Sequence, residues 1–284
     1  MLSKSKKILS TLRKIVTTLI INLMFRLPIF RRIVSLRVTV TGGFGSQLIS
    51  YHAALKLQEM GFKVVFDITY FDFRNDTTSQ VTKFELDPYI EGEIANCQTN
   101  RGILSLRLDD SAQKFRIGIS SVIEKRDTIR PVILALNASS DNVDQNKFNI
   151  VIHVRRGDFC RVADYLRPIE EQISSLSSVL LASSNLIFLT DDPKTVLPEL
   201  AGIQKLKTEA VKYSVLGPEE SSLYNTLYLM INADILVASN SQLSLICTIL
   251  SKNLALFDPA NYVRDPKYSK TFSTHGRGIY SWRR

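Results

Sequence analysis

The sequence predicts an α/β protein made of two Rossmann-like halves that face each other across a cleft. Apolar runs of strand length alternate along the chain with stretches of helical periodicity. This alternation is typical of parallel sheets that are covered by helices on both faces. The 284 residues, 45% of them hydrophobic, are enough for two domains of roughly 110 to 140 residues each.

The first half opens as a strand, a glycine-rich loop, a helix and a second strand. We expect a buried strand at 37–41 (RVTVT), the loop GGFGS, a helix at Gln47–Met60 and a strand at Lys63–Asp67. Residues 70–145 are interrupted by polar stretches, so we interpret them as the rest of this domain and a linker.

A second series of elements begins after the linker. The expected elements are strands at Asn149–Val154, Leu186–Leu189, Ile235–Ala238 and Leu254–Phe257, and helices at 168–182, Glu219–Asn232 and Gln242–Ser251. The sequence therefore predicts an N-terminal domain at 35–146 and a C-terminal domain at 147–284.

Residues 1–34 form a separate basic segment. The first 37 positions carry nine basic residues and no acidic one, which accounts for the whole net charge of +9. The rest of the chain is neutral overall, which argues against a nucleic-acid-binding domain, because such domains pattern basic residues over a folded face. Apolar side chains recur with helical spacing, but the longest uncharged stretch, Ile15–Phe25, has eleven residues, against about 20 for a membrane span. We expect an amphipathic helix on an anionic membrane surface; a helix packed on the protein itself and a short anchor are the alternatives.

Cysteines and histidines give no sign of a metal or a disulfide framework. Cys97, Cys160 and Cys247 are odd in number and have no metal-ligand spacing, which indicates buried thiols in a reducing compartment. There is no D-x-D triplet and no cluster of histidines, so we expect neither a metal site nor a bound cofactor.

The GGFGSQ loop at 42–47 is the first candidate ligand site. Glycines allow a ligand to approach the backbone closely, and a helix start offers N–H groups to phosphate. We therefore expect Gly43, Gly45 and Gln47 to contact a nucleotide. A structural turn is the alternative, because Leu48 replaces the third glycine of the dinucleotide-binding pattern.

The HVRRGDF run at 153–159 is the second candidate. It places His153, Arg155, Arg156 and Asp158 where a strand leaves the sheet, which is where α/β proteins bind ligands. Alternation puts His153 and Arg155 on one side and Arg156 on the other. Arg155 can then bind phosphate oxygens, while Arg156 pairs with Asp158 or another acid. A structural Arg–Asp pair is the alternative.

Two further motifs also follow strands. Asp191 and Asp192 of FLTDDP can accept hydrogen bonds from a guanine, or cap a helix. Asn240, Ser241 and Gln242 of ASNSQLS bring polar groups to a helix start that suits a phosphate.

In their order along the chain, these motifs resemble those of the α-1,2-fucosyltransferases, and more loosely the wider group of GDP-fucose fucosyltransferases. The resemblance covers residues 37–257 and includes DITYF (67–71) and FELD (84–87); the H-x-R-R-x-D run is its specific part. The sequence departs from the family at Ser46, where asparagine is usual, and at Leu245–Ile246, where an aromatic pair is common.

The resemblance implies a GT-B-like fold and an inverting, metal-independent transfer of fucose from GDP-fucose to a hydroxyl of a glycan acceptor. It places Arg155 at the β-phosphate, His153 and Asp192 at the guanine, and Ser241 and Gln242 at the phosphate. The N-terminal domain would face the acceptor and the C-terminal domain would bind the GDP-sugar. Asp158 is the candidate base.

The setting that follows is a cytoplasmic enzyme, peripheral on the inner face of the membrane, in surface polysaccharide or lipopolysaccharide synthesis. Two other functions stay open. One is a nicotinamide-dependent oxidoreductase; the missing third glycine and the lack of a well-placed acid after the second strand argue against it, although Asp67 lies about 20 residues after the glycine loop. The other is a non-catalytic membrane-surface module of a polysaccharide assembly complex.

Overall fold

The protein is a mixed α/β chain whose two sheets are parallel, which confirms the predicted class. The computed structural model describes residues 34–71, 84–90, 104–108, 112–136, 147–157, 168–174, 176–208, 211–256 and 279–280. The expected N-terminal helix lies outside these residues, as do Asp158, Cys97 and Cys160.

The chain divides into two compact units. Unit 1 comprises Met1–Arg74 and Lys83–Ser121, and unit 2 comprises Asn75–Thr82 and Val122–Arg284. The division falls inside helix α5 (Ala112–Glu124), further toward the N-terminus than the expected boundary at 146. The reason is helix α6 (Arg126–Ala135), which packs against two helices of unit 2 and buries Ile129 and Ile133.

Unit 1 is built on a three-stranded sheet in the order β2-β1-β3. Its elements are β1 (Val34–Thr39), α3 (Phe44–Glu59), β2 (Lys63–Asp67), the short helix η1 (Thr69–Phe71), α4 (Asp87–Ile90), β3 (Leu104–Leu108) and most of α5. The first strand, helix and second strand follow the sequence prediction. β3 and α5 come from the stretch that polar residues interrupt.

Two glycines fix the position of α3 in unit 1. A Cβ at Gly118 of α5 would lie 2.1 Å from the carbonyl oxygen of Ile49, so only glycine lets the two helices approach this closely. The loop before α3 turns at Gly42, whose φ of 75° lies in the left-handed region that favours glycine.

Unit 2 contains a six-stranded sheet in the order β6-β5-β4-β7-β8-β9. Its strands are β4 (Asn149–Val154), β5 (Asn185–Thr190), β6 (Tyr213–Leu216), β7 (Ile235–Val237), β8 (Leu254–Leu256) and β9 (Ile279–Tyr280). Counted within the unit, this is the 3-2-1-4-5-6 order of the doubly wound dinucleotide-binding folds. The order reverses between β4 and β7, which makes that pair the topological switch point.

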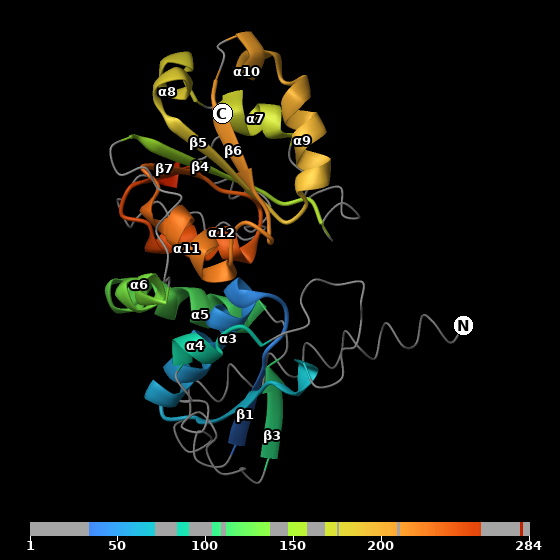
Figure 1. Ribbon diagram of the computed structural model, residues 1–284. Coiled ribbons are helices and arrows are strands. Elements are labelled where there is room, and N and C mark those ends of the chain that lie inside the picture. The colour runs from blue at the N-terminus through green and yellow to red at the C-terminus, as the bar shows by residue number, and fades with distance from the viewer. Residues whose placement is uncertain are drawn as a thin grey trace, which may run out of the picture. The chain divides into compact units, whose positions relative to one another are not determined.

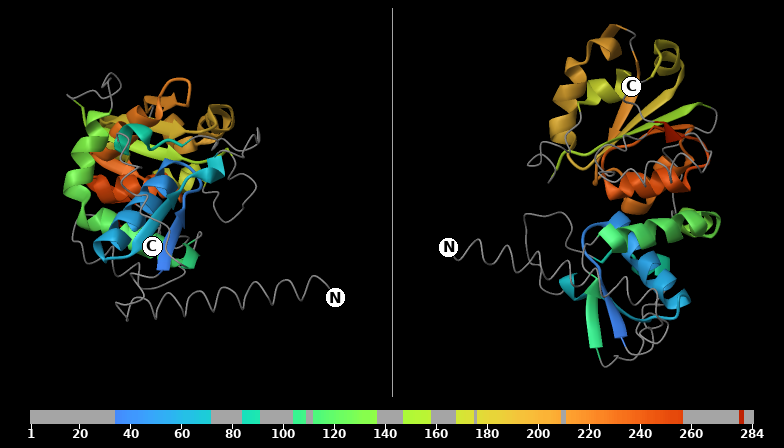
Figure 2. Two further views of the ribbon diagram at one scale, coloured as in Figure 1. Left: turned by 90° about the horizontal axis from the view of Figure 1, so that it is seen from below. Right: turned by 180° about the vertical axis from the view of Figure 1, so that it is seen from behind.

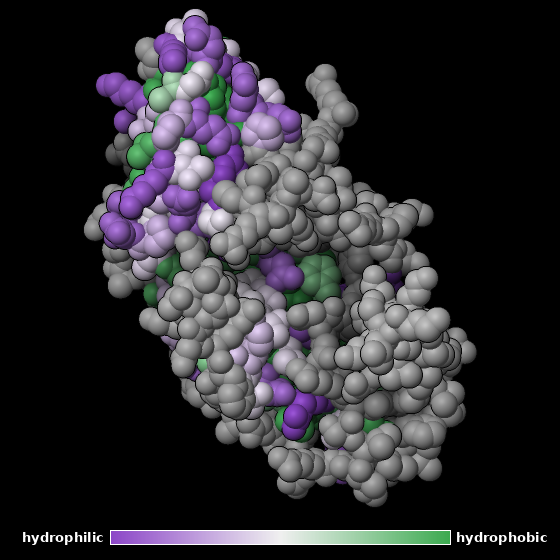
Figure 3. Space-filling view, turned by 90° about the vertical axis from the view of Figure 1, so that its right-hand side faces the viewer, coloured by the Kyte–Doolittle hydropathy of each residue, from purple (hydrophilic) through white to green (hydrophobic). Residues whose placement is uncertain are grey.

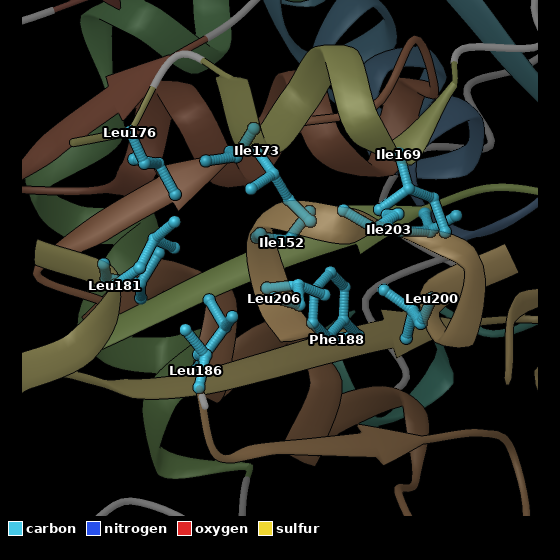
Figure 4. Packing of buried hydrophobic residues seen from close by; sticks show 14 of the residues in the cluster. Ile152, Ile169, Ile173, Leu176, Leu181, Leu186, Phe188, Leu200, Ile203 and Leu206 are labelled. Atoms are coloured by element: carbon cyan, nitrogen blue, oxygen red, sulfur yellow. The ribbon is translucent and has the colours of Figure 1, made fainter. Parts of the chain in front are cut away.

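Helices cover both faces of this sheet (Figures 1 and 2). One face carries α7 (Ile169–Ser174), α8 (Ser178–Ser183), α9 (Pro193–Gly202) and α10 (Gln204–Thr208). The other face carries α11 (Leu223–Asn232) and α12 (Gln242–Leu250), and α6 packs against these two helices. On the first face, Ile152 and Phe188 of the sheet pack with Ile173 and Leu200 in one buried cluster (Figure 4). Because even-numbered β4 residues face this cluster, the odd-numbered ones face α11 and α12.

The four expected strands and the expected helices near 219–232 and 242–251 are present, whereas α6, α10, β6 and β9 are not in the sequence prediction and α9 enters it only as the helix that Asp192 could cap. The helix expected at 168–182 is the pair α7 and α8, and Ser177 begins the second helix by accepting a hydrogen bond from the Leu180 N–H. β6 lies at the sheet edge with Tyr213 and Ser214 exposed, so it lacks the apolar run that marks a buried strand.

The visible surface of unit 2 is mostly hydrophilic, with scattered hydrophobic residues (Figure 3). Among the described residues of this unit, the most exposed large hydrophobic ones are Val179 at 77% and Leu197 at 48%, and they belong to different helices. Single exposed hydrophobic residues of this kind are normal on a solvated surface.

Candidate nucleotide-binding site

The candidate site lies at the switch point of unit 2. β4 and β7 are parallel neighbours, so their carboxyl ends meet at the same edge of the sheet. β4 carries His153 and leads into Arg155, and β7 leads into Ser239, Asn240 and Ser241. The HVRR and SNSQ motifs, which lie far apart in the sequence, are therefore brought together where α/β folds bind ligands.

A buried hydrogen-bonded cluster joins the two motifs. Nδ1 of His153 lies 2.6 Å from Oγ of Ser244 and 3.0 Å from Oγ of Ser239, and the two hydroxyls lie 3.0 Å apart. Oγ of Ser244 also accepts the Ser239 N–H at 3.1 Å. The cluster fixes the imidazole against the start of α12.

His153 is neutral at physiological pH. Burial, and then the positive charge of Arg155, lower the pKa of His153 from 6.5 to about 3. A neutral ring with Nδ1 held by hydroxyls can offer Nε2 to a polar group of a ligand.

Arg155 forms an ion pair at the end of β4. Its Nε lies 3.1 Å from Oδ2 of Asp191, the first residue after β5. The Arg155 side chain is 20% exposed, so it reaches the edge of the sheet, whereas Asp191 is 8% exposed. The pair therefore sets a guanidinium next to His153, with its carboxylate partner inside the protein.

Arg156 points the other way. Its Nε and Nη2 donate to the carboxylate of Glu199 on α9, at distances of 2.7 to 3.1 Å. Oε1 of Glu199 also accepts the Ile169 N–H at the start of α7. The side chain of Arg156 thus pairs with an acid on the opposite face from His153, as strand alternation predicts.

Of the two readings of Asp192, the structure shows the helix cap. Oδ1 of Asp192 accepts the Thr195 N–H at 3.3 Å, Oδ2 accepts the Thr195 hydroxyl at 2.6 Å, and Pro193 occupies the first turn. Asp191 binds the backbone N–H of Arg156 at 2.7 Å in addition to its ion pair with Arg155. Both carboxylates therefore have structural contacts.

The start of α12 is capped in the same way. Oγ of Ser241 accepts the Ser244 N–H at 3.0 Å. Asn240 is buried, and Gln242 is the partly exposed first residue of the helix. This helix start lies next to the His153 cluster, where its dipole favours an anion.

The GGFGSQ loop of unit 1 is tied to a carboxylate of its own chain. Oε2 of Glu85 accepts the Phe44 N–H at 2.7 Å, at the start of α3. The Gln47 amide donates to the Gly42 carbonyl and accepts the Glu85 N–H. A carboxylate thus occupies the helix start where a phosphate was expected, so we leave Gly43, Gly45 and Gln47 out of the proposed donor site.

Three residues that hold the strand ends of unit 2 or the glycine loop of unit 1 in place are not among the site residues that the sequence predicts. They are Ser244, Glu199 and Glu85. The capping pattern of Ser241 with Ser244 is a local signal that points to the first of them. Glu85 belongs to the FELD segment (84–87) of the motif resemblance, which gives it no role, and no local pattern indicates Glu199, whose partner Arg156 lies 43 residues away.

The expectations on metal binding, cysteines and membrane spans can be compared with the structure only for the described residues. Among those residues, no group of three or more His, Cys, Asp or Glu side chains is arranged to hold a metal ion. Cys247 is a buried free thiol, and burial raises its pKa. Within the same residues, no helix has both the length and the apolar character required to cross a bilayer.

Comparisons with known proteins add little to this geometry. No family model matches the chain. No curated protein matches it either. Among solved structures, the chain is similar to POFUT1 in complex with GDP, with 11% sequence identity and a TM-score of 0.37, over 78% of this chain and 95% of that chain. A similarity this low carries no argument, so the function has to be inferred from the site.

Proposed function

We propose that unit 2 binds a nucleoside diphosphate sugar and that the protein is a glycosyltransferase. The observation that carries this proposal is the position of Arg155, a partly exposed guanidinium at the switch point beside a neutral histidine and a capped helix start. A diphosphate fits this combination, because it matches both the planar guanidinium and the positive end of the helix.

The turn after β4 favours a nucleotide sugar over a dinucleotide. The strand order is that of a dinucleotide-binding fold, and in those folds the turn after the first strand is glycine-rich, so that the backbone approaches the pyrophosphate. Here that turn carries Arg155 and Arg156 instead. A side-chain cation at the phosphate therefore replaces the close backbone contact, and the nicotinamide-dependent alternative loses support.

Arg155 is the proposed catalytic residue. When the sugar leaves, the diphosphate gains negative charge, and a fixed cation stabilises that charge more in the transition state than in the ground state. His153 lies on the same side of β4, and its neutral ring can contact the nucleobase without repelling Arg155. Asp158 remains the proposed base.

The finer proposal rests on the motif resemblance. The donor is GDP-fucose, the transfer is inverting and needs no metal, and the acceptor is a hydroxyl of a glycan in surface polysaccharide synthesis. The GT-B-like arrangement of an acceptor domain and a donor domain is part of this proposal, and so is a cytoplasmic enzyme on the inner face of the membrane.

A donor screen tests the proposal. GDP-fucose, GDP-mannose, UDP-sugars and NAD are compared for binding and, for the sugars, hydrolysis. We expect a GDP-sugar, GDP-fucose first, to bind and turn over, and activity to survive EDTA because Arg155 supplies the charge at the phosphate. Binding of NAD alone would contradict the proposal, and activity lost in EDTA and restored by Mn²⁺ would contradict the metal-independent mechanism.

The membrane proposal has a separate test. Deleting residues 1–34 is expected to leave a folded, active protein that binds anionic liposomes much less well, because the deletion removes eight basic residues and no acidic one. Sedimentation with anionic and with neutral liposomes measures the effect. Liposome binding that is unchanged by the deletion, or by high salt in the full-length protein, would show the assignment to be wrong.

A further inference from the structure

Asp191 is anchored from two sides at the end of β5. Its Oδ1 accepts the Arg156 N–H at 2.7 Å, and the side chain is 8% exposed. The register of the sheet pairs Val154 with Thr190, so Asp191 comes next to Arg155 when both strands continue by one residue. Its carboxylate is therefore fixed by the ends of two neighbouring strands.

The second oxygen of this carboxylate meets the guanidinium of Arg155. Oδ2 lies 3.1 Å from Nε. An arginine side chain has several rotatable bonds and loses much entropy when it is held in place. The contact is an ion pair without the geometry of a hydrogen bond, so charge attraction at this short distance is what holds the guanidinium beside the fixed carboxylate.

We propose that Asp191 is a positioning residue, which holds the guanidinium of Arg155 toward the donor diphosphate; this inference rests on the proposed function. It assigns Asp191 to the arginine instead of the guanine. Groups that support a catalytic side chain in this way determine whether it sits in the productive geometry.

This role predicts opposite effects on binding and on turnover. The negative charge of Asp191 repels the diphosphate of the intact donor, so its removal should not weaken binding of the GDP-sugar in the ground state and should favour it. Its removal also leaves Arg155 less well placed for the charge that develops on the leaving diphosphate, so turnover should fall. If Asp191 had only a structural role, its replacement would not lower turnover while leaving ground-state binding unchanged or stronger.

Asp191→Asn tests the inference, because the amide oxygen can still accept the Arg156 N–H. We expect the dissociation constant of GDP-fucose, measured without acceptor, to stay equal or decrease, and kcat to fall roughly 10- to 100-fold, the scale of a misplaced catalytic group. Calorimetry with GDP-fucose and a coupled assay of donor turnover give the two values.

Asp234→Asn is the matched control. Asp234 also accepts a backbone N–H of β4, from Asn149 at 2.8 Å, but at the opposite end of the strand from Arg155. We expect it to change neither the affinity for GDP-fucose nor kcat. If Asp191→Asn behaved like this control, the inference would be wrong, and it would also be wrong if Asp191→Asn lost affinity for GDP-fucose together with kcat, because Asp191 would then contact the nucleotide itself.

Arg155→Ala in the same series separates the two proposals. If Arg155→Ala lost turnover while Asp191→Asn kept it, the positioning role would fail and the phosphate site would stand. If Arg155→Ala kept full turnover, the proposed function would fail, and the role of Asp191 with it.

Discussion

Replacing Arg155 with alanine is expected to lower kcat roughly 10²- to 10³-fold, the scale of removing one preorganised charged donor from a transition state. The fold should stay intact, because the side chain reaches the edge of the sheet and its carboxylate partner keeps the Arg156 N–H. Thermal midpoint, GDP affinity and transfer rate, measured on purified protein, give the result.

Arg155→Lys is the conservative companion. It keeps the charge but cannot make a two-pronged contact with phosphate, so we expect it to restore turnover only in part. Full activity in the alanine variant would place the phosphate site elsewhere. Equal activity in the lysine variant and the unmodified protein would show that charge alone matters.

Replacing Arg156 with alanine is expected to act on stability instead. The change removes a guanidinium that is 7% exposed and leaves Glu199, which is 32% exposed, without its partner. We expect a loss of about 2 kcal/mol, between the values for exposed and for fully buried pairs. The thermal midpoint should fall by roughly 4 to 8 °C, while kcat of the folded protein should change little.

A double-mutant cycle provides the control for Arg156. In Arg156→Ala/Glu199→Ala, no carboxylate is left behind, so the double variant should be more stable than the sum of the single changes predicts. A large loss of turnover in Arg156→Ala without any drop in thermal midpoint would reverse the roles of the two arginines.

The sequence predicts well that Arg155 and Arg156 point to opposite faces of the sheet. Residues 149–154 form the expected strand, and alternation within one strand is a local property that needs no knowledge of its neighbours. The cap by Asp192 is local in the same sense, since it involves Thr195 only three residues away. The prediction left it as one of two alternatives.

The partners of the arginines could not be predicted, because they depend on strand order and helix placement. Asp191 reaches Arg155 because β5 lies beside β4, and Glu199 reaches Arg156 because α9 covers one face of the sheet. His153 and Ser244 meet across 91 residues of sequence. Such contacts need the sheet order, which motif spacing does not contain.

The glycine loop shows that a correctly predicted local pattern can still leave its binding partner undetermined. Its strand, turn and helix were predicted, yet the same glycine pattern suits a phosphate or a carboxylate of the chain itself. Glu85, 41 positions after Phe44, fills the helix start in the structure. The local pattern thus identified an anion position and gave no information on which anion occupies it.

The outer strand of the large sheet has a consequence for synthesis on the ribosome. β9 is formed by residues 279–280 and pairs with β8, which ends at Leu256. During translation the hydrogen-bonding edge of β8 therefore stays open until residues 279–280 have also left the exit tunnel, while synthesis proceeds at about 5 to 20 residues per second. An open edge can pair with another nascent chain, so the interval is a window in which chaperone binding would protect this protein.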